Sequence, residues 1–277
     1  MILAHITDIH YHPTQPSYHT DRTHALKKVI DTLPLIQKHA PDLYILGGDF
    51  ISAHPEDFET KLDHFYEILE PFVPVKQDCI FLLGNHEEKV FSIEQIQTTL
   101  SSLGFNTQLS GVKDFDEYRV IWVESHEFNQ NDQRTGIILH EALTFLENSI
   151  NSSSLPVVVV FHHSPIPTPQ KGNIYFEKYG FLEYRHRVSN HEEVVKLLSN
   201  PKVSLVINGH THWLTLNFLN QVPYFGGPSF SEHLNSANTG SHEGNPGVYS
   251  IIEISDTKKC VTVYAGEFAY ASLSFEK

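Results

Sequence analysis

The sequence has few cysteines, few basic residues and no long apolar run. Cys79 and Cys260 are the only two cysteines among 277 residues, which does not make a disulfide framework, so two reduced, buried thiols are expected. The 19 Lys and Arg residues are outnumbered by 33 Asp and Glu residues, giving a formal net charge of −14. Such a surface repels polyanions and argues against a duplex nucleic-acid partner. A small phosphate ester remains compatible, because bound cations reverse a local potential.

Membrane and export signals are also missing from the sequence. No apolar run approaches the ~20 residues of a transmembrane helix. The N-terminus, MILAHITDIH, lacks the basic start and the long apolar stretch of a signal peptide. These absences predict a cytoplasmic protein with no membrane span. A hydrophobic content of 40% is nevertheless enough for a sizeable core, and no linker divides the chain, so a single domain over residues 1–277 is expected.

Short apolar runs alternate with amphipathic stretches along the chain. Strands are predicted at Ile2–Ile6, Leu43–Leu46, Cys79–Leu83, Tyr118–Glu124, Val157–Phe161, Val203–Ile207, Leu214–Phe218, Val248–Ile254 and Cys260–Ala265. Helices are predicted at His24–His39, Phe58–Leu69, Ile93–Leu103 and Leu139–Ile150, with a further helix ending over Val194–Leu198. Pro34 is expected to end or kink the first helix. The strand-rich part Leu214–Lys277 favours an α/β fold with four layers, α/β/β/α, in which two mixed sheets are flanked by helices.

Five of the predicted buried strands are each followed by residues that can bind a metal ion. These segments are Asp8-Ile9-His10, Gly47-Gly48-Asp49, Gly84-Asn85-His86-Glu87, His162-His163-Ser164-Pro165 and Asn208-Gly209-His210-Thr211-His212. Ligand sites in open α/β sheets form beyond the carboxyl ends of strands, so we expect the five segments to meet at one edge. Each segment alone is common, and it is their combination in this order that predicts a site.

The residue types in these segments fit divalent transition metals. Carboxylates, imidazoles and an amide oxygen suit Mn, Fe, Zn, Co or Ni, of which Mn or Fe is favoured, and the absence of thiolates argues against a structural zinc site. Seven ligands are too many for one ion with open positions, so two ions sharing a bridging carboxylate are predicted. The seven ligands would be Asp8, His10, Asp49, Asn85, a histidine of the 162–163 pair, His210 and His212.

The five segments, in this order, resemble those of the binuclear metallophosphoesterases, the calcineurin-like phosphoesterase superfamily. The resemblance implies a first ion held by Asp8, His10, Asp49 and His212. It implies a second ion held by Asp49, Asn85, His163 and His210. His163 is preferred because the ligand in this family lies two residues before a proline, here Pro165, and His162 is the alternative.

The resemblance also implies roles for two residues that are not ligands. His86 would contact the phosphate and protonate or stabilise the leaving oxygen, while a metal-bridging hydroxide attacks phosphorus in line. Glu87 stands where many members carry aspartate, and either orients His86 or Asn85 or is purely structural. Purple acid phosphatases carry a tyrosine ligand three residues after the bridging aspartate, and Ser52 at that position makes this chain unlike them.

The stretch from His10 to Asp49 with its amphipathic helix is similar to that of class III cyclic-nucleotide phosphodiesterases. So is the order of helix Leu139–Ile150, a strand and the residues His162-His163-Ser164-Pro165. This similarity favours a phosphodiesterase acting on a small phosphodiester, such as a cyclic nucleotide. A phosphomonoesterase or phosphoprotein phosphatase on the same metals is the alternative, and a non-catalytic scaffold is a third hypothesis. A nuclease is disfavoured by the acidic composition.

The segment Gln170–Val188 is the best candidate for a lid over the site, and a packed surface excursion or oligomer contact is its alternative. It combines basic residues with aromatic ones in an otherwise acidic chain. Arginine pairs with phosphate and aromatic rings stack on bases, so Tyr184, Arg185 and Arg187 are predicted substrate contacts. A homodimer is a further expectation.

Overall fold

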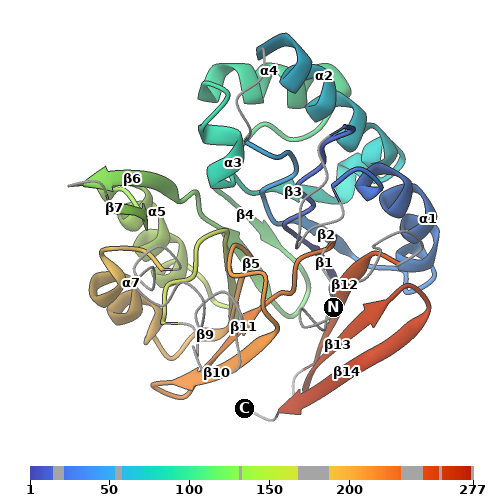
Figure 1. Cartoon of the computed structure of the whole chain (residues 1–277). Helices are drawn as coiled ribbons and strands as arrows, with labels where there is room; N and C mark the ends of the chain where they lie inside the picture. The colour runs from blue at the N-terminus through green and yellow to red at the C-terminus, as the bar shows by residue number, and fades with distance from the viewer. Residues whose placement is uncertain are drawn as a thin grey trace.

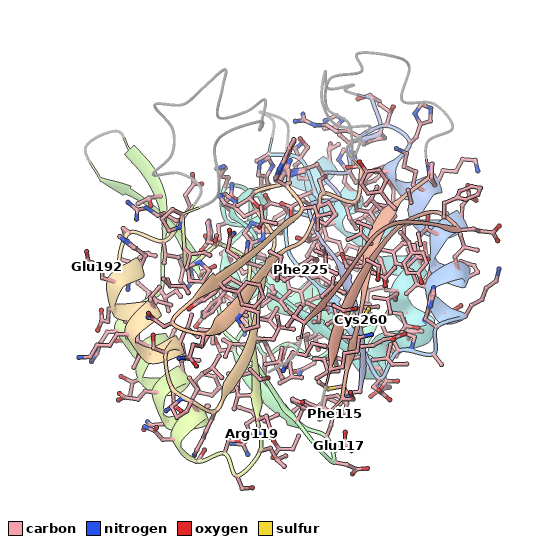
Figure 2. All side chains as sticks on the ribbon, turned by 90° about the horizontal axis from the view of Figure 1, so that it is seen from below. Phe115, Glu117, Arg119, Glu192, Phe225 and Cys260 are labelled. Carbon is pink, nitrogen blue, oxygen red and sulfur yellow. The ribbon has the colours of Figure 1, made fainter. Side chains whose placement is uncertain are left out.

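Two six-stranded sheets lie face to face between outer helices, which confirms the predicted four-layer architecture (Figure 1). The computed structural model describes residues 1–14, 22–53, 58–130, 133–167, 187–231, 246–255 and 258–275. Three hydrophobic clusters correspond to the three contacts between layers. One lies between the sheets and includes Leu43, Val160 and Phe225, and the other two lie under the helices on either side. Side chains such as Phe225 fill the space between the layers (Figure 2).

The first sheet has the strand order β14-β13-β12-β1-β2-β3. Its strands are β1 (Ile2–Ile6), β2 (Leu43–Leu46), β3 (Cys79–Phe81), β12 (Val248–Ile254), β13 (Lys259–Ala265) and β14 (Phe268–Phe275). Strands β1, β2 and β3 are parallel, whereas the pairings of β12 with β1, of β13 with β12 and of β14 with β13 are antiparallel. The sheet is therefore mixed, and its parallel half carries three of the five ligand segments.

The second sheet has the strand order β10-β11-β9-β8-β5-β4. Its strands are β4 (Gly111–Asp114), β5 (Arg119–Trp122), β8 (Val157–Phe161), β9 (Val203–Asn208), β10 (Thr215–Leu219) and β11 (Val222–Gly226). Strands β5, β8, β9 and β11 are parallel, and β4 and β10 pair antiparallel at the two edges. The five strands that precede the ligand segments are thus divided between two sheets and are not all neighbours in one.

Helices cover the outer face of each sheet. Those on the first sheet are α1 (Ala25–Gln37), α2 (Phe58–Leu69), the 3₁₀ segment η1 (Glu70–Asp78) and α4 (Ile93–Leu103). Those on the second are α5 (His140–Asn151) and α7 (His191–Leu198). The single-turn helix α3 (Asn85–Glu88) follows β3, and the hairpin of β6 (His126–Gln130) and β7 (Gln133–Ile137) projects beside it (Figure 1). No helix in the described ranges is long and apolar enough to cross a membrane.

Helix α1 runs through Pro34 and ends at Gln37, so of the two outcomes expected for this proline, ending or kinking the helix, the first is wrong. A proline in a helix removes one hydrogen bond to the carbonyl four residues earlier. That carbonyl belongs to Ile30, a residue that is 53% exposed, so water can bind it. Burial of Val29, Leu33 and Ile36 on the opposite face of the helix then stabilises the last turn.

Candidate metal centre

Four predicted ligands from the ends of β1, β2 and β9 form one buried cluster: Asp8, His10, Asp49 and His212. The Nε2 atoms of His10 and His212 lie 2.8 Å apart. Asp8 Oδ1 lies 3.3 Å from His212 Nε2, and Asp49 Oδ2 lies 3.8 Å from His10 Nε2. One carboxylate oxygen from each aspartate therefore points at the same small volume as two imidazole nitrogens.

A second cluster contains His162, His163 and His210 at the ends of β8 and β9. The amide of Asn85 joins it, with one terminal atom 2.8 Å from His210 Nδ1 and 3.3 Å from Asp49 Oδ2. The other terminal atom of that amide lies 2.8 Å from Lys89 Nζ. Asp49 Oδ2 thus lies between the clusters, where a bridging carboxylate would be required.

The two imidazoles of the 162–163 pair are held differently. His162 Nδ1 lies 2.7 Å from the Gly47 carbonyl and donates to it, which leaves Nε2 unprotonated in the neutral ring. That Nε2 lies 3.3 Å from Asn85 Oδ1 and 3.6 Å from Asp49 Oδ1. A backbone carbonyl on the far nitrogen is typical of metal-binding histidines. His163 Nδ1 contacts Ser125 Oγ at 2.8 Å, and its ring lies 4.4 Å from that of His210.

The two carboxylate oxygens of Asp8 give a further reason to expect divalent cations at this site. Asp8 Oδ2 accepts hydrogen bonds from Thr7 Oγ1 at 2.6 Å and from the His210 amide at 2.9 Å. Asp8 Oδ1 is buried and has no hydrogen-bond partner among the residues that the structure describes. A buried carboxylate oxygen facing imidazole nitrogens is costly unless a cation balances it. Although burial alone would lower it, the carboxylates of Asp49 and Asp8 raise the pKa of His162 to about 9, which reflects the same negative potential.

The backbone of the ligand loops is unusual. Within the described part of the chain, eight residues other than glycine have a positive φ, and five of them are predicted ligands. These five are Asp8 (56°), His10 (52°), Asp49 (55°), His210 (66°) and His212 (59°). Such conformations are uncommon and cost energy, and they cluster at functional sites. They turn the backbone sharply at each of these five ligands.

Glu87 fixes the loop of the central carboxylate. Its side chain is fully buried and accepts four backbone N–H groups, from Asp49 at 2.9 Å, Phe50 at 2.7 Å, Ile51 at 3.2 Å and Gly84 at 3.1 Å. Burial, together with the nearby Asp49 charge, raises the pKa of Glu87 to about 7. Of the two roles expected for Glu87, orienting His86 or Asn85 or being structural, these hydrogen bonds to the Asp49 loop and to Gly84 favour the structural one.

His86 lies beside the first cluster and is oriented through its backbone and ring. Its N–H donates to Asp49 Oδ1 at 2.8 Å, and its Nδ1 accepts from the Ala53 N–H at 2.9 Å. The proton of the neutral ring is therefore on Nε2. The His86 ring lies 4.4 Å from that of His10, and burial lowers the pKa of His86 to about 4. His86 is thus a neutral hydrogen-bond donor in this structure, not an imidazolium.

The predicted substrate contacts lie in the Gln170–Val188 segment, most of which is outside the described residues. Tyr184 and Arg185 fall outside them. Arg187 is described, and its Nη1 lies 2.7 Å from His191 Nε2 at the start of α7. Sequence reasoning missed Ser125, Thr7 and Lys89. Ser125 follows the predicted strand Tyr118–Glu124 directly, so the strand-end rule could have identified it.

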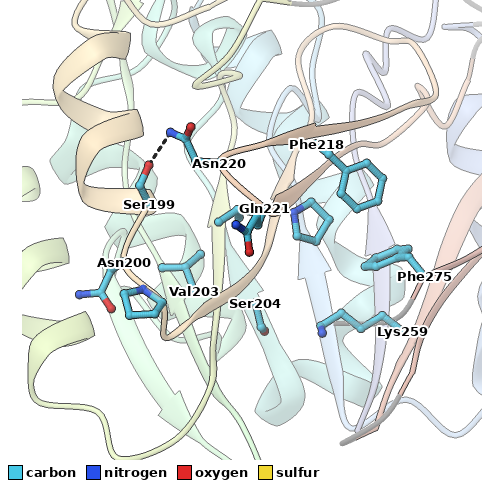
Figure 3. A pocket seen from close by; sticks show the side chains of 12 residues that line it. Ser199, Asn200, Val203, Ser204, Phe218, Asn220, Gln221, Lys259 and Phe275 are labelled. Carbon is cyan, nitrogen blue, oxygen red and sulfur yellow. Dashed lines mark hydrogen bonds between the residues drawn. The ribbon is translucent and has the colours of Figure 1, made fainter.

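The structure also has a cavity of about 350 Å³ away from the ligands. It is lined by Val203 and Ser204 at the start of β9, whereas His210 follows the end of that strand. Asn220 donates to Ser199 across its rim, and the aromatic rings of Phe218 and Phe275 form another side (Figure 3). None of its lining residues is a predicted ligand, so it lies at the opposite end of the sandwich from the clusters.

Comparison with known proteins finds a match to one protein-family model and several solved structures with a similar fold. A family model described as calcineurin-like phosphoesterase matches residues 1–214. No curated protein sequence matches the chain. The chain is similar in structure to a dimetal phosphatase from Danio rerio, with a TM-score of 0.78, 12% identity, and coverage of 100% of this chain and 98% of that one.

Two other solved structures show how widely this fold is used. A purple acid phosphatase, PPD1, from yellow lupin has a TM-score of 0.63 and 13% identity, with coverage of 100% of this chain and 53% of that one. GAP50 of Plasmodium, described as the anchor in the inner membrane complex, has a TM-score of 0.57 and 10% identity, with coverage of 100% and 88%. At such identities these likenesses show the fold alone.

Proposed function

The chain belongs to the calcineurin-like phosphoesterase family, and we propose that it is a metal-dependent phosphodiesterase acting on a small phosphodiester. The observation that carries this proposal is the pair of ligand clusters that meet at Asp49, with the buried Asp8 Oδ1 facing two imidazoles. Asp8, His10, Asp49 and His212 would hold one divalent ion. Asp49, Asn85, His162 and His210 would hold the other. Mn or Fe is the favoured metal, because the donors are carboxylate, imidazole and amide.

His162 is preferred to His163 in this ligand set on geometric grounds. Its Nε2 lies 3.3 Å from Asn85 Oδ1 and 3.6 Å from Asp49 Oδ1, and its other nitrogen is held by a carbonyl. His163 remains a member of the same cluster. Metal analysis of His162→Asn and His163→Asn separates the two: His162→Asn should lose one ion per chain, and His163→Asn should keep both. The opposite result would restore the ligand that the sequence favours.

Bound divalent ions would activate water and offset the charge of the phosphoryl oxygens. The side chains then have two tasks. Glu87 holds the amides of residues 49–51 and so keeps the Asp49 carboxylate between the clusters. His86 offers Nε2–H as a hydrogen-bond donor, because the Ala53 amide occupies its Nδ1. A neutral donor would stabilise charge that develops on an ester oxygen.

A diester is favoured over a monoester by charge. A phosphodiester carries one negative charge and a phosphomonoester carries up to two near neutral pH, while the chain has a net charge of −14. Lys89 Nζ lies 2.8 Å from the Asn85 amide, but it also forms an ion pair with Glu127 at 3.1 Å. Both Lys89 and Arg22 nevertheless act electrostatically on His86, which keeps a monoesterase as the second candidate.

The deciding experiment compares bis-p-nitrophenyl phosphate with p-nitrophenyl phosphate, using Mn, Fe, Co, Ni and Zn in turn. Faster turnover of the diester is expected, and a 2′,3′- or 3′,5′-cyclic nucleotide is the first natural compound to test. Negligible diester turnover with every metal would refute the proposal, and faster monoester turnover would favour the second candidate. His86→Ala should keep both ions and lower kcat about 10²–10⁴-fold.

A further inference from the structure

Helix α3 carries two residues of the proposed site on a single turn. It spans only Asn85–Glu88. One turn is not stable on its own, since helix nucleation costs more than one hydrogen bond returns. Contacts with the rest of the protein must therefore hold it. Glu87 and Glu88 make such contacts on two sides, because Glu87 binds the amides of the Asp49 loop and Glu88 binds strand β6.

Both carboxylate oxygens of Glu88 are used by strand β6. Oε1 lies 2.5 Å from His126 Nδ1, and Oε2 accepts the N–H of Glu127 at 2.7 Å. The side chains of Glu88 and His126 are only 17% and 19% exposed, so water screens this pair weakly. The hydrogen bond to Glu88 raises the pKa of His126, and Glu124 lies 3.7 Å from the other ring nitrogen. A charged, directional contact thus joins α3 to β6.

The same hairpin also contacts the second ligand cluster. Ser125, just before β6, holds His163 Nδ1 at 2.8 Å. Gly136 on β7 lies against the His163 ring so closely that an added Cβ would come within 2.7 Å of it. Next to Glu88, Lys89 pairs with Glu127 and lies 2.8 Å from the Asn85 amide. The start of β6 therefore touches both sides of the half-site formed by Asn85, His162, His163 and His210.

We propose that Glu88 and His126, with the Glu127 amide, form a clasp that positions Asn85 for the second metal ion and His86 for the substrate. The inference rests on the proposed function, because it assigns positioning residues to that site. Neither clasp side chain contacts the metal ligands directly. Its effect passes through α3: when the clasp opens, the turn frays, the Asn85 amide loses its fixed position, and His86 loses its alignment with Ala53.

The test uses His126→Ala, which leaves the sequence of α3 intact, and Glu88→Gln, which keeps the shape of the side chain. His140→Ala is the matched control, because His140 is an exposed histidine at the start of α5. Backbone hydrogen exchange over residues 84–91 is measured in the metal-free protein, and Mn²⁺ titration gives the affinity for the second ion. Partners behind metal ligands typically contribute 10–100-fold to affinity. Both variants should exchange at least about 10-fold faster and bind the second ion about 10-fold more weakly, while His140→Ala matches the wild type.

Kinetics add a second readout, for which kcat is divided by the folded fraction measured by circular dichroism, so that lost stability does not count. With saturating Mn²⁺, the clasp variants should show a reduced normalised kcat and a nearly unchanged KM. Exchange and second-ion affinity within twofold of wild type in both variants would overturn the clasp. If His126→Ala does not fold, Glu88→Gln decides alone. If the wild type hydrolyses no phosphoester, the proposed function fails, but exchange and metal titration still decide whether the clasp exists.

Discussion

Replacing Glu87 by glutamine tests the idea that one buried carboxylate fixes the metal-bridging loop. Each carboxylate oxygen accepts two backbone N–H groups: Oε1 accepts from Phe50 and Ile51, and Oε2 from Asp49 and Gly84. Glutamine has the same shape but only one acceptor oxygen. Two buried N–H groups would then face an NH₂ group. Leaving a buried donor unsatisfied costs about 1–3 kcal/mol, so the free energy of unfolding should fall by about 2–6 kcal/mol.

Urea denaturation of the metal-free protein measures this loss. The slope of the unfolding free energy against urea concentration should stay constant, so that a lower midpoint reports stability alone. Glu117→Gln is the control, since Glu117 is an exposed glutamate at the edge of the molecule (Figure 2) and should change stability by less than about 0.5 kcal/mol. A Glu87→Gln variant within about 0.5 kcal/mol of wild type would show that the four hydrogen bonds do not hold the loop.

Three further predictions concern Gly84, the two cysteine thiols and the bound metal ions. Gly84→Ala would place a Cβ 2.1 Å from the Asp49 nitrogen, so it should destabilise the protein by at least about 1–3 kcal/mol and reduce metal content; a wild-type urea midpoint would contradict this. Burial raises the pKa of Cys79, whereas hydrogen bonds from neighbouring hydroxyl groups outweigh burial and lower the pKa of Cys260. Iodoacetamide at pH 8 should therefore label Cys260 first. Equal labelling of the two thiols, measured by mass spectrometry, would refute this prediction. Manganese at 100 times its Kd should stabilise the protein by about 2.7 kcal/mol per ion, which a thermal melt measures. In Asn85→Ala, the stabilisation that the second ion contributes should be absent. A wild-type melting temperature that does not change with manganese would oppose the binuclear site.

The sequence predicted the buried elements well because their signals are local. The ranges Ile2–Ile6, Val157–Phe161 and Ile93–Leu103 match β1, β8 and α4 residue for residue. Helix α4 begins after Ser92, whose side chain caps it, and ends at Gly104 in a left-handed conformation. Five strands of the described residues were not predicted: β4, β6, β7, the buried strand β11 and the edge strand β14. In β14, most side chains are exposed, so no alternation of buried and exposed residues marks it.

For the candidate site too, local sequence signals predict some features, and other features depend on contacts between distant residues. The rule that ligand sites form beyond the carboxyl ends of strands identifies the residues of both clusters, because each ligand segment follows an apolar run that is easily recognised as a strand. It does not give the arrangement, because β1, β2 and β3 belong to one sheet and β8 and β9 to the other. Nor does it give Glu87 or Glu88 their partners in the Asp49 loop and in β6, which lie 36–39 residues away in the chain. Hydrogen bonds over such distances depend on the packed fold.

The left-handed ligand residues explain why the site needs this non-local support. Aspartate and histidine occur at many backbone angles, so nothing in the sequence marks Asp8, His10 or Asp49 as left-handed. Each such residue costs about 1–3 kcal/mol, and five of them are too costly to persist in isolated loops. The loops bind one another instead: the Asp8 amide donates to Gly48, the His10 amide to the Asp49 carbonyl, and the His210 amide to the Asp8 carboxylate. Because folding supplies these bonds, the ligands are held in place before any metal binds, and metal affinity should depend on residues such as Glu87 that never touch the ion.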